Sequence, residues 1–144
     1  MIDFWTSGQL WAKSAYNTMW CLIGCAIGDL GTIAYFQFTG IPWHTLYIML
    51  LAMTNGLITS IVLETFILMR RQHFPLITAL RTAMGMSFLS MLAMEAAMNT
   101  TDFIMTGGAL LTPTVILPML LAGFITPWPY NYWRLKKLGL GCCH

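Results

Sequence analysis

Residues 84–98 read MGMSFLSMLAMEAAM, a stretch in which repeated methionines surround a single glutamate. As a helix, the stretch places Met84, Met91 and Met98 on one side, because they recur at every seventh residue, and Glu95 falls beside them. The segment that contains it is apolar and long enough to cross a bilayer. A carboxylate near the middle of such a segment is rare, and it predicts a functional site.

Two interpretations of this stretch are open. Thioether sulfurs together with a carboxylate suggest a site for a soft metal ion such as Cu(I). In the other interpretation the methionines fill gaps in a helix bundle, and Glu95 is a hydrogen-bonded structural residue. The choice depends on which other side chains lie at the same depth.

The composition indicates an integral membrane protein. Of the 144 residues, 58% are hydrophobic and only 8% are charged, whereas a soluble domain carries about 25% charged residues. The length fits one domain over residues 1–144. The net charge of +2 gives no reason to expect nucleic acid as a partner. The first residues have no basic region, so we expect no cleavable signal peptide.

The expected fold class is all-α, an integral membrane four-helix bundle. Four apolar segments predict spans at residues 14–38, 44–69, 78–105 and 109–132. Residues 2–12 mix Trp5 and Trp11 with polar residues, which predicts a short interfacial helix before the first span. Pro113 and Pro118 are expected to kink the fourth span or to delay its start.

The basic residues predict the orientation of the bundle. All seven lie before the first span, between the second and third spans, or after the fourth: Lys13, Arg70, Arg71, Arg81, Arg134, Lys136 and Lys137. Because Lys and Arg favour the cytoplasmic side, both termini and the loop between the second and third spans are expected to be cytoplasmic.

Several candidate ligands then fall at one depth in the membrane. At a rise of ~1.5 Å per residue, Cys25 and Glu95 lie near the middle of their spans, and Asp29 lies about one turn further outward. Charged side chains should face the interior of the bundle. The predicted layer consists of Cys25, Asp29, Met53, Met94, Glu95 and Met98. Cys21, Glu64 and Met84 would form a second layer nearer the cytoplasm.

The cysteines add two further motifs. Cys21 and Cys25 lie one helical turn apart, so that two thiols could share one soft ion or simply pack together. The chain ends with Cys142, Cys143 and His144. This terminal group is either a soft-metal site on the cytoplasmic side or a cluster of no consequence.

Three motifs carry a resemblance to a known family. CLIGCAIGD at 21–29, MEAAMN at 94–99 and PYNYWR at 129–134 resemble the signatures of a bacterial four-helix family catalogued only as a domain of unknown function. The resemblance covers nearly the whole chain and implies a multi-pass protein of the bacterial inner membrane. It also implies an association with copper handling, with Cys25, Asp29 and Glu95 as the positions to test.

The favoured hypothesis is that the protein binds or transports Cu(I). The ion would enter from the outer side past the methionine set, be held by Cys25, Asp29 and Glu95, and leave past Cys21 and Met84 toward the terminal group. The methionine set consists of Met49, Met53, Met98 and Met105. Four helices enclose only a narrow path, so we expect a homo-oligomer or a subunit of a membrane complex.

Two other hypotheses are open. The chain could be an accessory subunit of a larger complex without a ligand of its own, with the face of Gly24 and Gly28 packed on another subunit. It could also conduct protons or ions through Asp29, Glu64 and Glu95. The sequence contains no motif of a nucleophilic, haem or zinc enzyme, so we expect no enzyme activity.

Overall fold

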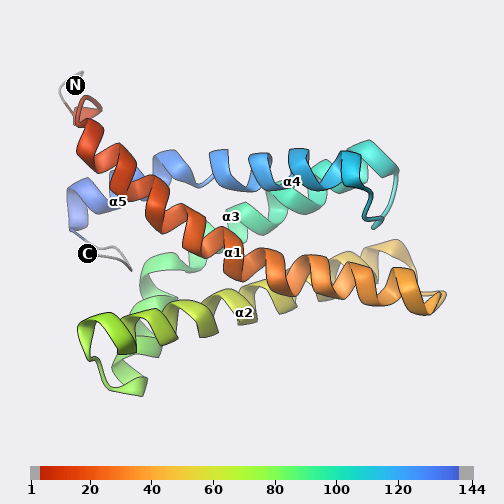
Figure 1. Cartoon of the computed structure of the whole chain (residues 1–144), viewed down its shortest axis with the longest axis horizontal. Coiled ribbons are helices and arrows are strands. Elements are labelled where there is room, and N and C mark those ends of the chain that lie inside the picture. The colour runs from red at the N-terminus through yellow and green to blue at the C-terminus, as the bar shows by residue number, and fades with distance from the viewer. Residues whose placement is uncertain (1–3, 140–144) are drawn as a thin grey trace.

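The computed structural model describes residues 4–139, and this part of the chain is all-helical, as predicted (Figure 1). The helices are α1 (Gly8–Thr39), α2 (Thr45–Gln72), α3 (Leu76–Thr106), α4 (Pro113–Ile125) and α5 (Trp128–Leu138). Gly40 and Gly107 end α1 and α3 in the left-handed conformation. Their amides donate to the Phe36 and Phe103 carbonyl oxygens at 3.0 and 2.8 Å, so these turns close the two helices.

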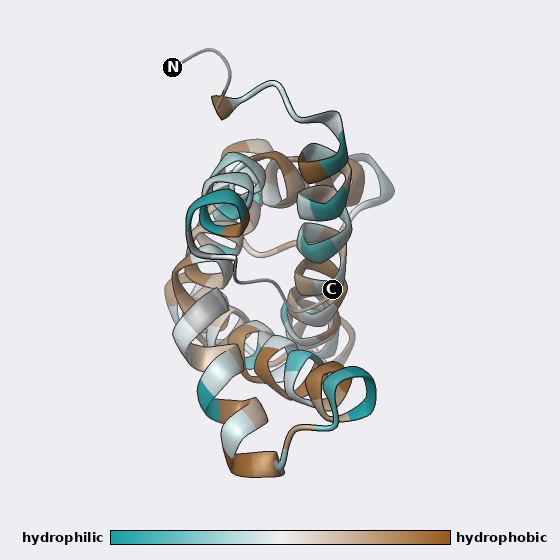
Figure 2. Ribbon diagram, turned by 90° about the vertical axis from the view of Figure 1, so that its left-hand side faces the viewer, coloured by the Kyte–Doolittle hydropathy of each residue, from teal (hydrophilic) through white to brown (hydrophobic). Residues whose placement is uncertain are grey.

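The helices run side by side along the long axis of the molecule. The helix α1 packs mainly on α2, α3 packs on α2 and α4, and α5 packs on α1. The start of α1, the α2–α3 connection and α5 lie at one end, on the left in Figure 1. In Figure 2, hydrophobic and hydrophilic residues are interleaved around each helix. Large apolar side chains are exposed along the helices, as expected for surfaces that contact lipid.

Two helices, α1 and α2, are long and apolar enough to cross a membrane. A third span arises if the two parts of α3, Leu76–Gly85 and Ser87–Thr106, are counted together across their 55° bend. The expected fourth span at 109–132 is interrupted, because α4 has 13 residues and α5 starts as a separate helix at Trp128. Pro127 and Pro129 lack the amide hydrogens that a continuous helix needs there.

The expected delay at Pro113 is confirmed, since α4 begins at this residue. The expectation of a separate interfacial helix over residues 2–12 is wrong. The helix α1 begins at Gly8 and continues into the first span without a break. Trp5 and Trp11 instead stack on buried Tyr132 of α5, with ring centroids 5.1 and 4.2 Å apart. Residues 5–11 are thereby attached to α5 by aromatic packing.

Glycines allow α1 and α2 to approach closely. A Cβ on Gly24 would lie 2.6 Å from the Cα of Ser60, and one on Gly28 would overlap the Asn55 backbone. The Thr59 hydroxyl donates to the Gly24 carbonyl oxygen at 2.6 Å. The close approach predicted from the glycine spacing is confirmed at these two positions. However, the helix that uses this face is α2 of the same chain and not another subunit.

We expect Gly28→Ala to destabilise the protein by about 1–3 kcal/mol, the usual cost of overpacking a close contact. The new methyl group would meet backbone atoms of Asn55, which cannot rotate away. Thermal unfolding in detergent, followed by circular dichroism, measures the change. Gly31→Ala on the same helix is the matched control, since a Cβ there would have no atom within 4 Å. Equal melting temperatures for the two variants would contradict the close packing.

The bend in α3 corrects the predicted methionine stripe. Met91 and Met98 are fully buried, but Met84 is 48% exposed. Met84 lies before the 55° bend that separates Leu76–Gly85 from Ser87–Thr106. The bend turns the first part of α3 away from the axis of the second, so Met84 does not belong to an inner layer with Cys21 and Glu64.

Candidate functional site

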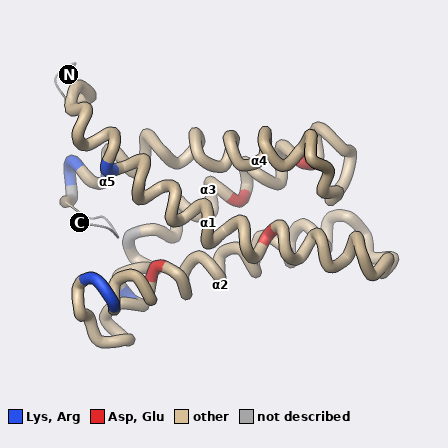
Figure 3. The backbone as a smooth tube through the Cα atoms, in the orientation of Figure 1, with Lys and Arg blue, Asp and Glu red and all other residues tan. Residues whose placement is uncertain are grey.

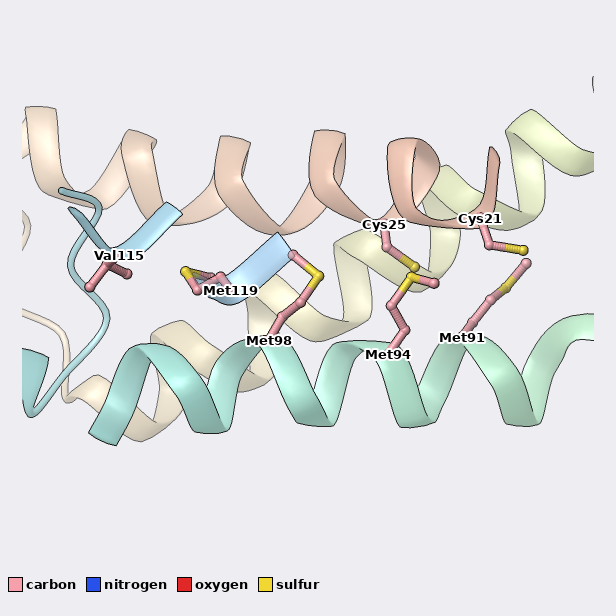
Figure 4. Packing of buried hydrophobic residues seen from close by; sticks show 7 residues of the cluster. All are labelled: Cys21, Cys25, Met91, Met94, Met98, Val115 and Met119. Carbon is pink, nitrogen blue, oxygen red and sulfur yellow. The ribbon is translucent and has the colours of Figure 1, made fainter. Parts of the chain in front are cut away.

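A row of buried sulfur atoms lies at the centre of the molecule (Figure 4). It consists of Cys21 and Cys25 from α1, Met91, Met94 and Met98 from α3, and Met119 from α4. None of these side chains is more than 1% exposed. In Figure 4 the side chains of Cys25 and Met94 point toward each other across the interface, as do those of Cys21 and Met91.

Helical spacing explains how the sequence builds this row. Cys21 and Cys25 are four residues apart, so they lie on one face of α1, and the three methionines follow one another on the facing side of α3. Gly123 of α4 leaves room for Met98, since a Cβ there would lie 2.9 Å from its sulfur atom. The sulfur row therefore depends on three helices, and α4 contributes both the Met119 sulfur and a small residue, Gly123.

Glu95 is fully buried beside this row. Its carboxylate lies against Gly56 of α2, where a Cβ would overlap Oε1. The Cys25 thiol and the Asp29 carboxylate are its ionisable neighbours on α1. Apart from the Cys25 thiol beside it, the carboxylate has no hydrogen-bond partner among the residues that the structure describes. A buried carboxylate without partners is costly, and it marks a place where a cation or a proton can bind.

Asn99 links Asp29 to Glu95 by two hydrogen bonds. The amide nitrogen of Asn99 donates to Asp29 Oδ1 at 3.0 Å and to the Glu95 carbonyl oxygen at 3.1 Å. Within residues 4–139, Asp29 Oδ2 and Asn99 Oδ1 have no partner. Asp102, one turn further along α3, differs, because Thr106 donates to its Oδ1 and the Leu110 amide donates to its Oδ2. Asp29 and Glu95 therefore offer free acceptor atoms, whereas Asp102 has a structural role.

A second polar cluster lies toward the basic end. The Cys21 thiol donates to Glu64 Oε1, Ser87 lies beside Glu64, and Arg134 Nη1 donates to the Ser87 hydroxyl at 3.5 Å. All four side chains are at most 2% exposed. Glu64 Oε2 and Arg134 Nε find no partner in the described part of the chain. The sequence analysis used Arg134 only as one of the basic residues that indicate the orientation in the membrane. Its place in the motif at 129–134 could have indicated a special role.

The structure brings most of the predicted site residues together. Cys21, Cys25, Asp29, Met94, Glu95 and Met98 lie along the α1–α3 interface. Met53 is only partly buried on α2 and is not in the sulfur row. Met49 lines a separate cavity of about 460 Å³ near His44, and Met105 is 49% exposed. Cys142, Cys143 and His144 lie outside the described residues.

The types of side chain in this region bear on which metal ions it could suit. Over residues 4–139, no group of three or more His, Cys, Asp or Glu side chains is arranged to hold a metal ion. The sulfur row supplies thiol and thioether groups, and these soft groups are of the type that suits Cu(I).

The fold and the site define a small all-helical protein whose helices include two that can cross a membrane. Residues 10–139 match the model of the family described as a domain of unknown function (DUF4396), and the chain belongs to this family. No curated protein and no solved structure matches the chain. The membership of an uncharacterised family is confirmed, while the three signature motifs and the copper association stay predictions.

Proposed function

We propose that this protein binds Cu(I) in the buried sulfur row and moves it across the bacterial inner membrane. The observation that carries the proposal is the row itself, which holds six sulfur side chains, each at most 1% exposed, in one continuous cluster. Thiolate and thioether sulfurs are the ligands that Cu(I) prefers. Gap-filling methionines alone do not account for the two cysteines and the unpartnered carboxylates beside them.

Within this row, Cys25 and Met94 form the central ligand pair. They point toward each other, and Met98 follows on the next turn of α3 (Figure 4). Glu95 and Asp29 lie beside them with unpartnered oxygens, so their negative charge would stabilise a cation in this apolar region. Cys21 and Met91 offer the next position toward the basic end. Met84 and Met105 do not belong to the path, since both are about half exposed.

The proposed topology has four spans with both termini in the cytoplasm. The helices α4 and α5 would then form a broken fourth span. The support comes from the charges, since the Lys and Arg residues gather at one end of the molecule, on the left in Figure 3. Such a distribution is typical of a membrane protein whose basic end faces the cytoplasm.

We expect the full-length protein to bind Cu(I) stoichiometrically, and the double variant Cys21→Ser/Cys25→Ser to lose this ion. The measurement is an anaerobic titration of the detergent-purified protein against a chromogenic Cu(I) chelator. Met94→Leu should weaken binding by about tenfold or more, which corresponds to ~1.4 kcal/mol. Met84→Leu is the matched control, because Met84 is exposed and outside the row.

A parallel series carries Cys142→Ser/Cys143→Ser, so that any ion held by the terminal group is counted separately. Stoichiometric Cu(I) that remains in the Cys21→Ser/Cys25→Ser variant of this series would overturn the assignment of the site. Equal affinities of the Met94→Leu and Met84→Leu variants would exclude Met94 as a ligand.

One observation supports the alternative of an accessory subunit. A groove of about 490 Å³ lies between α1 and α2, lined among others by Ile27, Gly31, Tyr35 and Ile58. The space beside Gly31 is open, so another helix could approach closely there. A stable membrane partner that co-purifies with metal-free protein would favour this function over copper binding.

A further inference from the structure

The first part of α3 carries an apolar face that the other described helices leave uncovered. On its inner side, Ala79 and Ala83 pack with Leu68 and are at most 1% exposed. The opposite side carries large apolar side chains at helical spacing. They are 41–74% exposed: Ile77, Leu80, Met84 and Phe88. In a chain that crosses a membrane, such a face is suited to contact lipid.

Two hollows lie on this face, and Leu80 lines both of them. The larger, of about 610 Å³, extends across the bend and is lined by Ile77, Leu80, Arg81, Met84, Gly85 and Phe88. The smaller, of about 270 Å³, lies between the end of α2 and the start of α3. It is lined by Val62, Thr65, Phe66, Met69, Leu76 and Leu80. Two adjacent apolar hollows match the two acyl chains of one phospholipid.

The larger hollow also contains a cation without a partner. Arg81 is exposed and forms no hydrogen bond, ion pair or ring contact with the residues that the structure describes. The other three arginines each contact another side chain: Arg70, Arg71 and Arg134. None of the described residues that line the two hollows is acidic. A free guanidinium above an apolar surface is suited to a phosphate group, which it binds through paired N–H donors.

The smaller hollow has polar groups of its own. Thr65 is 5% exposed, and its hydroxyl has no hydrogen-bond partner in the described part of the chain. Thr54 on the same helix instead donates to the Leu50 carbonyl oxygen at 2.8 Å. Phe66, which lines the same hollow, has the Arg70 guanidinium 5.4 Å from its ring centroid. The Thr65 hydroxyl is therefore available to an ester oxygen, and a second cation lies nearby.

We propose that the end of α2 and the first part of α3 bind one anionic phospholipid. Arg81 binds its phosphate, and the acyl chains occupy the hollows on the two sides of Leu80. The α2–α3 connection lies at the end where Lys and Arg gather (Figure 3), which the proposed topology places in the cytoplasm. Basic pockets between helices at this depth attract the anionic lipids of the inner leaflet. The site needs neither the sulfur row nor Cu(I).

Titration of the detergent-purified full-length protein with dioleoyl phosphatidylglycerol tests the proposal, with native mass spectrometry to count bound lipid. We expect one bound molecule. Dioleoyl phosphatidylcholine, with the same acyl chains but no net charge, should bind about fivefold more weakly. Arg81→Gln should lower the affinity for phosphatidylglycerol by about fivefold. Equal affinities of the parent protein for the two lipids would overturn the proposal.

Lys137→Gln is the matched control for Arg81→Gln. Lys137 is an exposed basic residue at the same end of the molecule and lines neither hollow, so this variant should bind phosphatidylglycerol like the parent protein. The elution volume and melting temperature of each variant establish that it is folded. Equal affinities of the Arg81→Gln and Lys137→Gln variants would show that only the overall charge matters, and would overturn the site.

A second pair of variants tests the acyl chains. Leu80→Ala removes apolar surface from both hollows, so it should weaken phosphatidylglycerol binding by about fivefold. Leu89→Ala is its control, because Leu89 is 58% exposed on α3 and lines neither hollow. Glycerol 1-phosphate, which has the phosphate but no chains, should not displace the lipid at equal concentration. Displacement, or equal effects of the two alanine variants, would indicate a site for free anions and overturn the lipid assignment.

Two further results separate this site from the other occupants and from copper binding. A dimer that is lost in Leu80→Ala, in place of a bound lipid, would assign the face to a second copy of the chain and overturn the proposal. Arg81→Gln should leave Cu(I) affinity unchanged, because Arg81 lies outside the sulfur row. The variant Cys21→Ser/Cys25→Ser should still bind phosphatidylglycerol. Loss of the lipid from this variant, if it is folded, would contradict the independence of the two sites.

Discussion

Replacing Gly56 by alanine is expected to displace the Glu95 side chain and to destabilise the protein by roughly 3 kcal/mol, the upper part of the usual range for overpacking. The new methyl group would overlap Glu95 Oε1, and the Cys25 carbonyl oxygen lies 3.0 Å from the same point. The carboxylate is fully buried, so it cannot move into water. The melting temperature and the Cu(I) affinity of the variant should both fall.

A double-mutant cycle tests whether this contact is the cause. In Gly56→Ala/Glu95→Ala the clashing carboxylate is absent, so the second change should offset part of the loss that Gly56→Ala causes alone. Gly31→Ala serves again as the control for adding a methyl group to a helical glycine. A Cβ at this position would have no atom within 4 Å. Strictly additive effects of the two changes would contradict the contact between Glu95 and Gly56.

Arg134→Met is expected to destabilise the protein by about 1–3 kcal/mol, the cost of leaving buried polar groups without a partner. Arg134 is 2% exposed, bonds to Ser87 and lies near Glu64. Methionine keeps the length and the apolar part of the side chain but leaves Glu64 without a nearby cation. Denaturation in detergent, followed by circular dichroism, measures the loss.

Two further variants make this prediction specific. Arg81→Met removes an exposed arginine and should change the stability by no more than about 0.5 kcal/mol. Glu64→Gln combined with Arg134→Met removes the uncompensated charge, so the double variant should be more stable than Arg134→Met alone. If Arg134→Met is as stable as Arg81→Met, the electrostatic role assigned to Arg134 is wrong.

Much of the candidate site could be predicted from the sequence, because charged side chains in apolar helices favour the interior of a helix bundle. Asp29 and Glu95 had to point inward, and helical spacing then fixed the sides on which Cys25, Met94 and Met98 lie. The depth argument placed these residues at one level, and in the structure they lie together along the α1–α3 interface.

The errors come from features that depend on tertiary packing. On α2 the buried positions recur at every fourth residue, as Ala52, Gly56, Ser60 and Glu64. Met53 lies one residue off this stripe, which is about 100° around the helix, so it does not reach the sulfur row. Helical spacing alone could not resolve which of two adjacent residues faces inward.

The burial of Arg134 could not be predicted for a similar reason. In the sequence it follows a group of aromatic residues and reads as one member of a basic anchor. It is buried because α5 is separated from α4 at Pro127 and packs on α1. The interruption of the fourth segment thus places the Arg134 guanidinium near Glu64. A continuous helix over 109–132 gives no reason to expect a cation there.

The bend in α3 also matches the helix to the thickness of a bilayer. A straight helix of 31 residues would be about 46 Å long, far more than the ~30 Å of the hydrocarbon layer. The part after the bend, Ser87–Thr106, is about 30 Å long. In the proposed topology, the oblique part before it lies along the inner headgroup region instead of protruding into the cytoplasm. In that topology the bend reduces hydrophobic mismatch in the helix that carries Glu95.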